Sequence, residues 1–143
     1  MENKQALTNI LNIGSSVGGA QAKVLVAIND STGEIKAGDV LHKNKNFQYY
    51  IVKLAYESGT PWGKEKTYIE HVYNQMAKNA GLNVMPCELI VSQNGTHFKT
   101  LRYDRKDGEK IHVQTLKAIT GYAHKRIPFS YEEAFMVLER LGV

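Results

Sequence analysis

Residues 47–81 read FQYYIVKLAYESGTPWGKEKTYIEHVYNQMAKNAG, and the periodicity of this stretch changes halfway along it. Phe47 to Leu54 is rich in aromatic and β-branched residues, which predicts a β-strand. Apolar residues then recur every three or four positions, so we expect a helix over about residues 62–80 with one apolar face. The residues of that face are Ile69, Val72, Tyr73, Met76 and Ala80.

Two tight turns are predicted after this helix. Asn94-Gly95 lies between two apolar segments and favours a hairpin over about residues 87–103. Asp107-Gly108 marks a second turn, and Lys110 to Val113 is the expected return strand.

A closing helix is expected over about residues 130–141, because Ser130-Tyr131-Glu132-Glu133 has the pattern of a capping box. The strands are joined by hairpins and not by repeated helical crossovers. The order of elements therefore predicts an α+β fold with an antiparallel β-sheet, one long packed helix and a further helix at the end. We expect residues 1–143 to form a single domain.

Composition narrows the class of protein. The chain has 143 residues, of which 43% are hydrophobic and 22% charged, as in ordinary soluble domains. No apolar run approaches the roughly 20 residues that a membrane span needs, and residues 1–5 do not resemble a signal peptide. A single cysteine, Cys87, excludes an internal disulfide and fits a cytoplasmic location. The net charge is +4, but the basic residues are scattered along the chain and form no recognised nucleic-acid-binding motif. Direct nucleic-acid binding is therefore not expected.

A glycine-rich segment, residues 14–23, reads GSSVGGAQAK and leads directly into a predicted strand. Glycine lets backbone N–H groups approach phosphate closely, and a loop that opens into a strand suits the phosphate-covering loop of kinases. A P-loop or Rossmann site would have the strand before the glycines and a helix after them. The alternative is an ordinary surface loop.

Lys53 lies inside the apolar strand of residues 47–54, and Glu65 and Glu70 follow on the predicted helix. In a kinase, a strand lysine contacts the α- and β-phosphates of ATP and pairs with a helix glutamate. Glu70 flanks the apolar face and is the better placed of the two carboxylates. The alternative is a lysine that points to solvent from an edge strand.

Arg102-Tyr103-Asp104-Arg105 ends a predicted strand. It is either an ordinary surface ion-pair network or a hinge segment whose backbone meets an adenine edge. Other chemistry is not indicated: the five histidines lack metal-ligand spacing, and Ser15 and Ser16 are not in a nucleophile elbow. Cys87 in its apolar strand reads as an inert thiol.

Several motifs together resemble HipA-like serine/threonine kinases, the toxin components of bacterial type II toxin–antitoxin modules. The resemblance covers nearly the whole chain and implies a protein-kinase-like N-lobe. It rests on residues 14–23, 51–54, 62–73, 76–82, 97–98, 102–105 and 111–116.

The resemblance implies roles for particular residues. Lys53 would be the ATP-binding lysine, Glu70 its ion-pair partner, and Ser16 a candidate for autophosphorylation. The implied ATP-binding residues are Ser16, Val17, Gly18, Gly19, Ala20, Lys23, Lys53, Glu70, Leu101, Tyr103 and Asp104. The family uses ATP and Mg²⁺, phosphorylates serine on proteins and binds a helix-turn-helix antitoxin.

The chain departs from the family pattern in several places. Tyr103 replaces the more usual Phe, and Gln21-Ala22 replaces a frequent Arg-Pro. The catalytic Asp and the metal-binding Asn and Asp, which a kinase needs, belong to a helical C-lobe that the family places beyond Val143. We therefore expect the chain to hold no catalytic or metal-binding residue and to be inactive alone, as a piece of a larger kinase. A stand-alone binding or regulatory module and one half of a split kinase are the alternatives.

Overall fold

The computed structural model describes residues 22–38, 45–55, 62–63, 65–92, 95–121 and 130–142. The chain divides into two compact units, Met1–Ile111 and His112–Val143. The fold is α+β with an antiparallel sheet, as the sequence predicts. Residues 14–21, most of the glycine-rich segment, lie outside the described residues.

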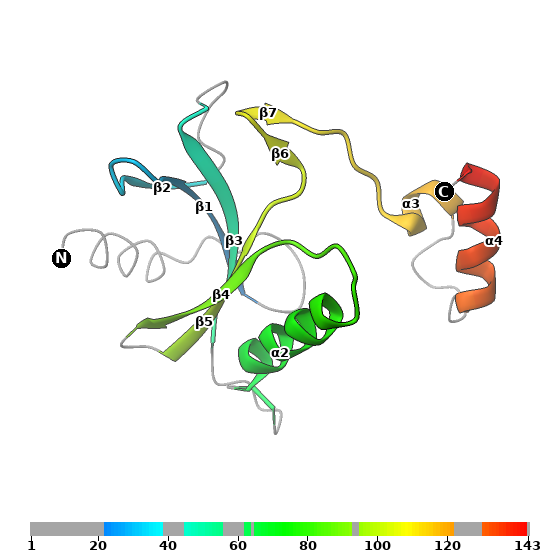
Figure 1. The fold of residues 1–143 in the computed structure, drawn as a ribbon, viewed down its shortest axis with the longest axis horizontal. Helices are drawn as coiled ribbons and strands as arrows, with labels where there is room; N and C mark the ends of the chain where they lie inside the picture. Colours follow the sequence, from blue (N-terminus) through cyan, green and yellow to red (C-terminus); the bar gives the residue numbers. More distant parts are fainter. Residues whose placement is uncertain are drawn as a thin grey trace. The chain divides into compact units, whose positions relative to one another are not determined.

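A five-stranded antiparallel sheet forms the body of the first unit (Figure 1). Its order is β2-β1-β3-β5-β4, so β3 lies at the centre and β5 is its neighbour. The predicted hairpin is confirmed as β4 and β5, and the lysine strand is confirmed as β3. The strands are β1 (Lys23–Asn29), β2 (Ile35–Ala37), β3 (Phe47–Lys53), β4 (Cys87–Ser92) and β5 (Gly95–Leu101).

Both faces of this sheet bury apolar side chains, because alternate residues of a strand point to opposite faces. On one face Val24, Val26 and Val52 form a fully buried cluster. On the other face Ala27 pairs with Tyr49 in register, and both are buried. Lys53 belongs to this second face, since it is four residues from Tyr49 on the same strand.

Helix α2 (Lys66–Asn79) follows β3 in the chain and contacts β4 and β5. It begins four residues later than the expected position, and Glu65 at its start provides no side-chain cap. The apolar face named from the sequence points outward: Ile69, Val72, Tyr73 and Met76 are all exposed.

The side of α2 that meets the sheet is polar. Thr67 is fully buried and donates its hydroxyl hydrogen to the Thr96 carbonyl at 2.7 Å. Asn74 Nδ2 donates to the Met85 carbonyl at 3.1 Å. Hydrogen bonds of this kind satisfy polar groups that would otherwise be costly to bury, so periodicity predicts the helix but not the face that packs.

A short hairpin of β6 (Arg105–Lys106) and β7 (Glu109–Lys110) follows the sheet. Asp107 and Gly108 both have a left-handed φ, 51° and 79°, as a two-residue hairpin turn of this composition requires. The return strand is therefore Glu109–Lys110 and not Lys110 to Val113, because the two-residue turn places it directly after Gly108.

The second unit contains α3 (Leu116–Thr120) and α4 (Tyr131–Leu141). The capping box of α4 is confirmed: Glu133 N donates to Ser130 Oγ at 3.2 Å, and Ser130 N donates to Glu133 Oε2 at 2.9 Å. Helix α3 was not predicted from the sequence, because its five residues are too few to show a helical period. Within the described ranges, no helix is both long and apolar enough to cross a membrane.

Candidate functional site

Lys53 and Glu70 form an ion pair between the last residue of β3 and the second turn of α2. Both side chains are about one-third exposed, at 31% and 30%, so water still reaches the pair. The Lys53 ammonium also lies 5.8 Å from the centre of the Phe98 ring, within cation–π range. Of the two glutamates considered from the sequence, the structure therefore brings Glu70 to Lys53.

A second lysine lies beside Lys53 on the same face of the sheet. Lys23 of β1 pairs directly with Lys53 in the antiparallel register. The neighbouring residues are also bonded: the backbone N–H of Leu54, which follows Lys53, donates to the carbonyl of Ala22, which precedes Lys23, at 2.9 Å. The described end of the glycine-rich segment is thus hydrogen-bonded to the chain next to Lys53. Ser16, Val17, Gly18, Gly19 and Ala20, the other expected phosphate-binding residues, lie outside the described residues.

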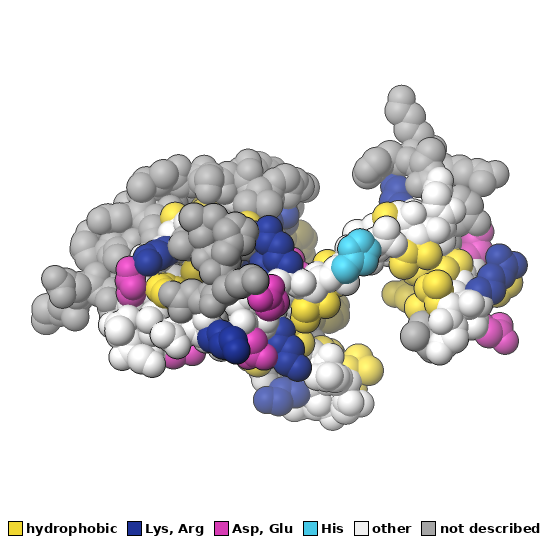
Figure 2. Space-filling model, turned by 90° about the horizontal axis from the view of Figure 1, so that it is seen from above, with side chains coloured by type: hydrophobic (Ala, Val, Ile, Leu, Met, Phe, Trp, Pro, Cys, Tyr) yellow, Lys and Arg dark blue, Asp and Glu magenta, His cyan; other side chains and the backbone are white. Residues whose placement is uncertain are grey.

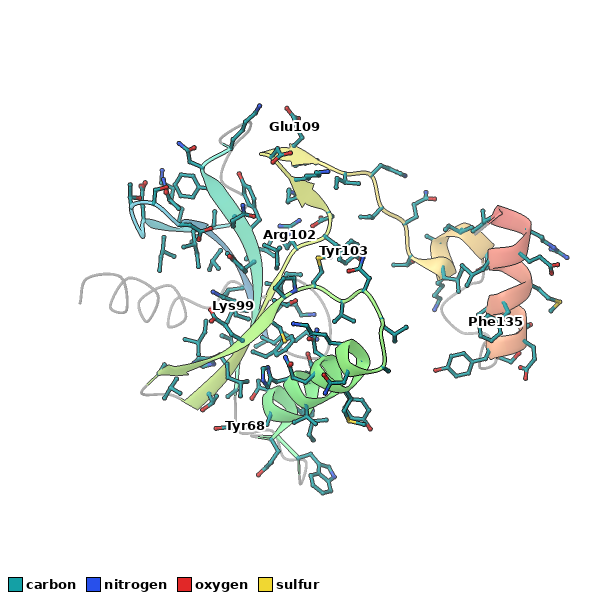
Figure 3. The ribbon with its side chains drawn as sticks, in the orientation of Figure 1. Tyr68, Lys99, Arg102, Tyr103, Glu109 and Phe135 are labelled. Carbon is teal, nitrogen blue, oxygen red and sulfur yellow. The ribbon has the colours of Figure 1, made fainter. Side chains whose placement is uncertain are left out.

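The turn end of the β4–β5 hairpin contacts both elements that carry this ion pair. Thr96 accepts hydrogen bonds from α2: its carbonyl from Thr67 Oγ1 at 2.7 Å, and its hydroxyl from Tyr68 Oη at 2.9 Å. The next residue, His97, accepts at Nδ1 from the backbone N–H of Ala55 at 3.0 Å. Figure 3 shows Tyr68 at the start of α2.

His97 is buried and held in one protonation state by its partners. Because Nδ1 accepts from Ala55, the ring proton of the neutral form is on Nε2, which contacts Ser92 Oγ at 2.7 Å. Burial lowers the pKa of His97 below its usual value. The imidazole is therefore a structural acceptor in its neutral form.

The expected adenine-contacting segment, Leu101 to Tyr103, begins at the last residue of β5 and continues beyond the strand (Figure 3). Leu101 N donates to the Pro86 carbonyl at 3.0 Å, and Arg102 N donates to the Tyr49 carbonyl at 2.8 Å. These two backbone donors are therefore used within the protein. The side chain of Tyr103 is exposed.

Asp104 is the centre of an arginine cluster. Arg102 binds its carboxylate with two donors, at 2.8 and 2.7 Å, and Arg105 Nη1 adds a third at 2.9 Å. Both arginine side chains are only 9% exposed. The hydrogen bond from Arg102 is the main reason that the pKa of Asp104 lies below its usual value. This cluster fixes the backbone that follows β5.

The opposite face of the sheet carries a separate lysine with its own carboxylate. Lys99 pairs with Val52 in register, forms an ion pair with Glu88 and lies 4.3 Å from the centre of the Tyr50 ring. Figure 2 shows basic and acidic side chains side by side on the visible face of the first unit, with no large patch of one sign.

Cys87 lies in β4 with its Sγ 3.5 Å from His71 Nδ1. Burial is the main cause that raises the pKa of Cys87, which favours the unreactive thiol. Among the residues that the structure describes, no group of three His, Cys, Asp or Glu side chains could hold a metal ion.

The sequence named Lys53, Glu70 and Asp104 as candidates, together with Arg102 and Arg105, which bind Asp104. It gave no role to the residues around the Lys53–Glu70 pair. Thr67, Thr96 and His97 have no distinctive local pattern, and their role depends on contacts between distant segments. Thr67 and His97 lie within ranges 62–73 and 97–98 of the family resemblance, but the resemblance gave neither residue a role.

The fold and the ion pair define a class: an α+β unit in which a strand lysine is paired with a helix glutamate. The model of the HipA-like C-terminal domain family matches residues 15–143, nearly the whole chain. The chain therefore belongs to this family. Neither a curated protein nor a solved structure matches it.

Proposed function

We propose that this chain is the ATP-binding lobe of a HipA-like serine/threonine protein kinase. The observation that carries the proposal is the Lys53–Glu70 ion pair between β3 and α2 in a chain of this family. A kinase uses this arrangement to hold an ammonium group against the α- and β-phosphates of ATP. Lys23, on the adjacent strand and the same face, adds a second positive charge for polyphosphate.

The phosphate-binding loop in this proposal is the glycine-rich segment, residues 14–23. Its described end is joined to the site, since the Ala22 carbonyl accepts from Leu54 N next to Lys53. The segment Leu101 to Tyr103 would meet the adenine edge. Because the N–H groups of Leu101 and Arg102 are used internally, the adenine contacts would fall on other backbone groups of this segment. Asp104 would support the segment through Arg102 and Arg105.

In the complete kinase we propose ATP and Mg²⁺ as cofactors, serine on a protein as the acceptor and a helix-turn-helix antitoxin as a partner, all in the cytoplasm. The 143 residues alone would bind nucleotide without transferring phosphate. No Asp is followed five positions later by Asn after Lys53, as the catalytic loop of a kinase requires.

An ATP titration followed by NMR, with and without Mg²⁺, tests the proposal. We expect shifts in residues 14–23, at Lys53 and in residues 101–103, and a loss of these shifts in Lys53→Met. Lys99→Met is the matched control, because Lys99 is also a paired lysine but lies on the opposite face. Absence of binding at millimolar ATP, or equal loss in both variants, would count against nucleotide binding by this chain.

A further inference from the structure

Three consecutive residues of β5, Thr96 to Phe98, contact both sides of the Lys53–Glu70 ion pair. Thr96 receives hydrogen bonds from the first turn of α2, and Phe98 pairs with Lys53 in register, with its ring beneath the ammonium. His97, between them, receives the Ala55 N–H two residues after Lys53. The hairpin strand therefore joins two elements that the chain connects only through the long β3–α2 segment.

The link on the helix side is close to Glu70. Thr67 is one helical turn before Glu70, and residues three apart on a helix lie on the same side. Thr67 is fully buried, and its hydroxyl is bonded to the Thr96 carbonyl at 2.7 Å. With the exposed bond from Tyr68, this buried bond holds the first turn of α2 against β5. Glu70 belongs to the same helix, so its position depends on that turn.

On the strand side, a hydrogen bond from Ala55 N–H to the His97 side chain follows the last ladder pair of β3 and β5. Lys53 pairs with Phe98, and the ladder between β3 and β5 ends there. The side chain of His97 then supplies an acceptor for Ala55 N–H at 3.0 Å, where no ladder partner remains. It holds the chain that leaves β3 and so limits the motion of Lys53 at the end of the strand.

We propose that Thr67 and His97 are positioning residues, which, through Thr96 to Phe98 of β5, set the contact between Lys53 and Glu70. The exposed apolar face of α2 supports this proposal. Because the apolar residues point away from the sheet, hydrogen bonds from the inner side of the helix, such as those of Thr67 and Asn74, hold it in place. A helix held in this way depends strongly on each bond. The relevance of this contact to phosphate rests on the proposed function, but the contact itself can be measured without nucleotide.

Zero-length carbodiimide cross-linking measures that contact directly, because it joins an amine and a carboxylate as an amide, with loss of water, only when they touch. The Lys53–Glu70 cross-link is quantified by mass spectrometry of the whole chain after digestion. Thr67→Val keeps the shape of the side chain and removes the hydroxyl, so we expect the yield to fall about three-fold or more. Thr67→Ser restores the donor and should restore the yield.

Thr100→Val is the matched control. Thr100 lies on β5, and its hydroxyl also donates to a backbone carbonyl, that of Pro86 at 3.4 Å. An unchanged yield in Thr67→Val, or an equal loss in Thr100→Val, overturns the proposal. If circular dichroism shows that Thr67→Val does not fold, Tyr68→Phe removes the exposed second bond to Thr96 and is judged by the same two criteria. A lower yield in Tyr68→Phe than in Thr100→Val supports the proposal, and an equal yield overturns it.

Discussion

The Lys53 ammonium lies against the Glu70 carboxylate although 17 residues separate them in the chain. The contact joins the end of the central strand, β3, to α2, and both side chains remain partly open to water. A pair in this position contributes little to stability because water screens it. In the proposed function, its role is to fix the direction in which the ammonium points toward a bound phosphate.

The first prediction separates these two effects. Glu70→Gln should lower the free energy of unfolding by less than about 1 kcal/mol, yet weaken ATP binding several-fold because the ammonium loses its fixed partner. Urea denaturation and isothermal calorimetry measure the two quantities. Glu88→Gln is the control, since Glu88 pairs with Lys99 on the other face and should leave ATP binding unchanged. A large loss of stability with unchanged binding would assign the pair a purely structural role.

Local sequence patterns predicted the elements well and their contacts less well. The capping-box pattern at Ser130 and the Asn94-Gly95 hairpin signal each depend on neighbouring residues in the sequence, so α4 and the β4–β5 hairpin lie where they were expected. The start of α2 was misplaced because no side chain caps it. The packed side of α2 could not be predicted, because Thr67 is buried in contacts with distant strands, and the carbonyl that accepts its hydrogen bond is 29 residues away.

The second prediction concerns His97 and pH. Burial lowers the pKa of His97 in the folded protein, so the unfolded chain takes up the proton first as the pH falls. Stability from the neutral imidazole is complete above the unfolded value of about 6.5 and is lost as the pH falls from there through the lower folded value. Unfolding free energies measured from pH 8 to pH 5 should show this decline.

His97→Gln should remove that part of the pH dependence, whereas His112→Gln, at an exposed position, should keep it. The same decline in wild type and in His97→Gln would show that another group titrates in this range.

The third prediction concerns the arginine cluster behind Leu101 to Tyr103. Asp104→Asn leaves Arg102 and Arg105, both nearly buried, without their shared carboxylate, and should lower stability by about 1–3 kcal/mol at neutral pH. The pKa of Asp104 is lowered in the folded state, so this stability is present above about pH 4 and is lost as the pH falls through the folded value.

Thermal denaturation at pH 7 and pH 3 checks both parts of this prediction. Asp107→Asn in the neighbouring turn is the control, because Asn tolerates the left-handed backbone at that position. If Asp104→Asn and wild type differ as much at pH 3 as at pH 7, the carboxylate charge is not what holds the cluster together.

The fourth prediction tests the outward face of α2. Val72 and Met76 are 52% and 58% exposed, so Val72→Gln and Met76→Gln should each change the free energy of unfolding by less than about 0.5 kcal/mol. Val52→Ala, in the buried cluster, should lower it by about 2 kcal/mol because it leaves a cavity. Sequence periodicity alone would predict similar losses at all three positions, since all three are apolar residues within periodic elements. Urea denaturation of the three variants therefore distinguishes a helix packed through Thr67 and Asn74 from one packed through its apolar face. Losses at Val72 and Met76 that match the loss at Val52 would mean that the apolar face is covered in solution, and the polar bonds to β5 would then be secondary in holding α2.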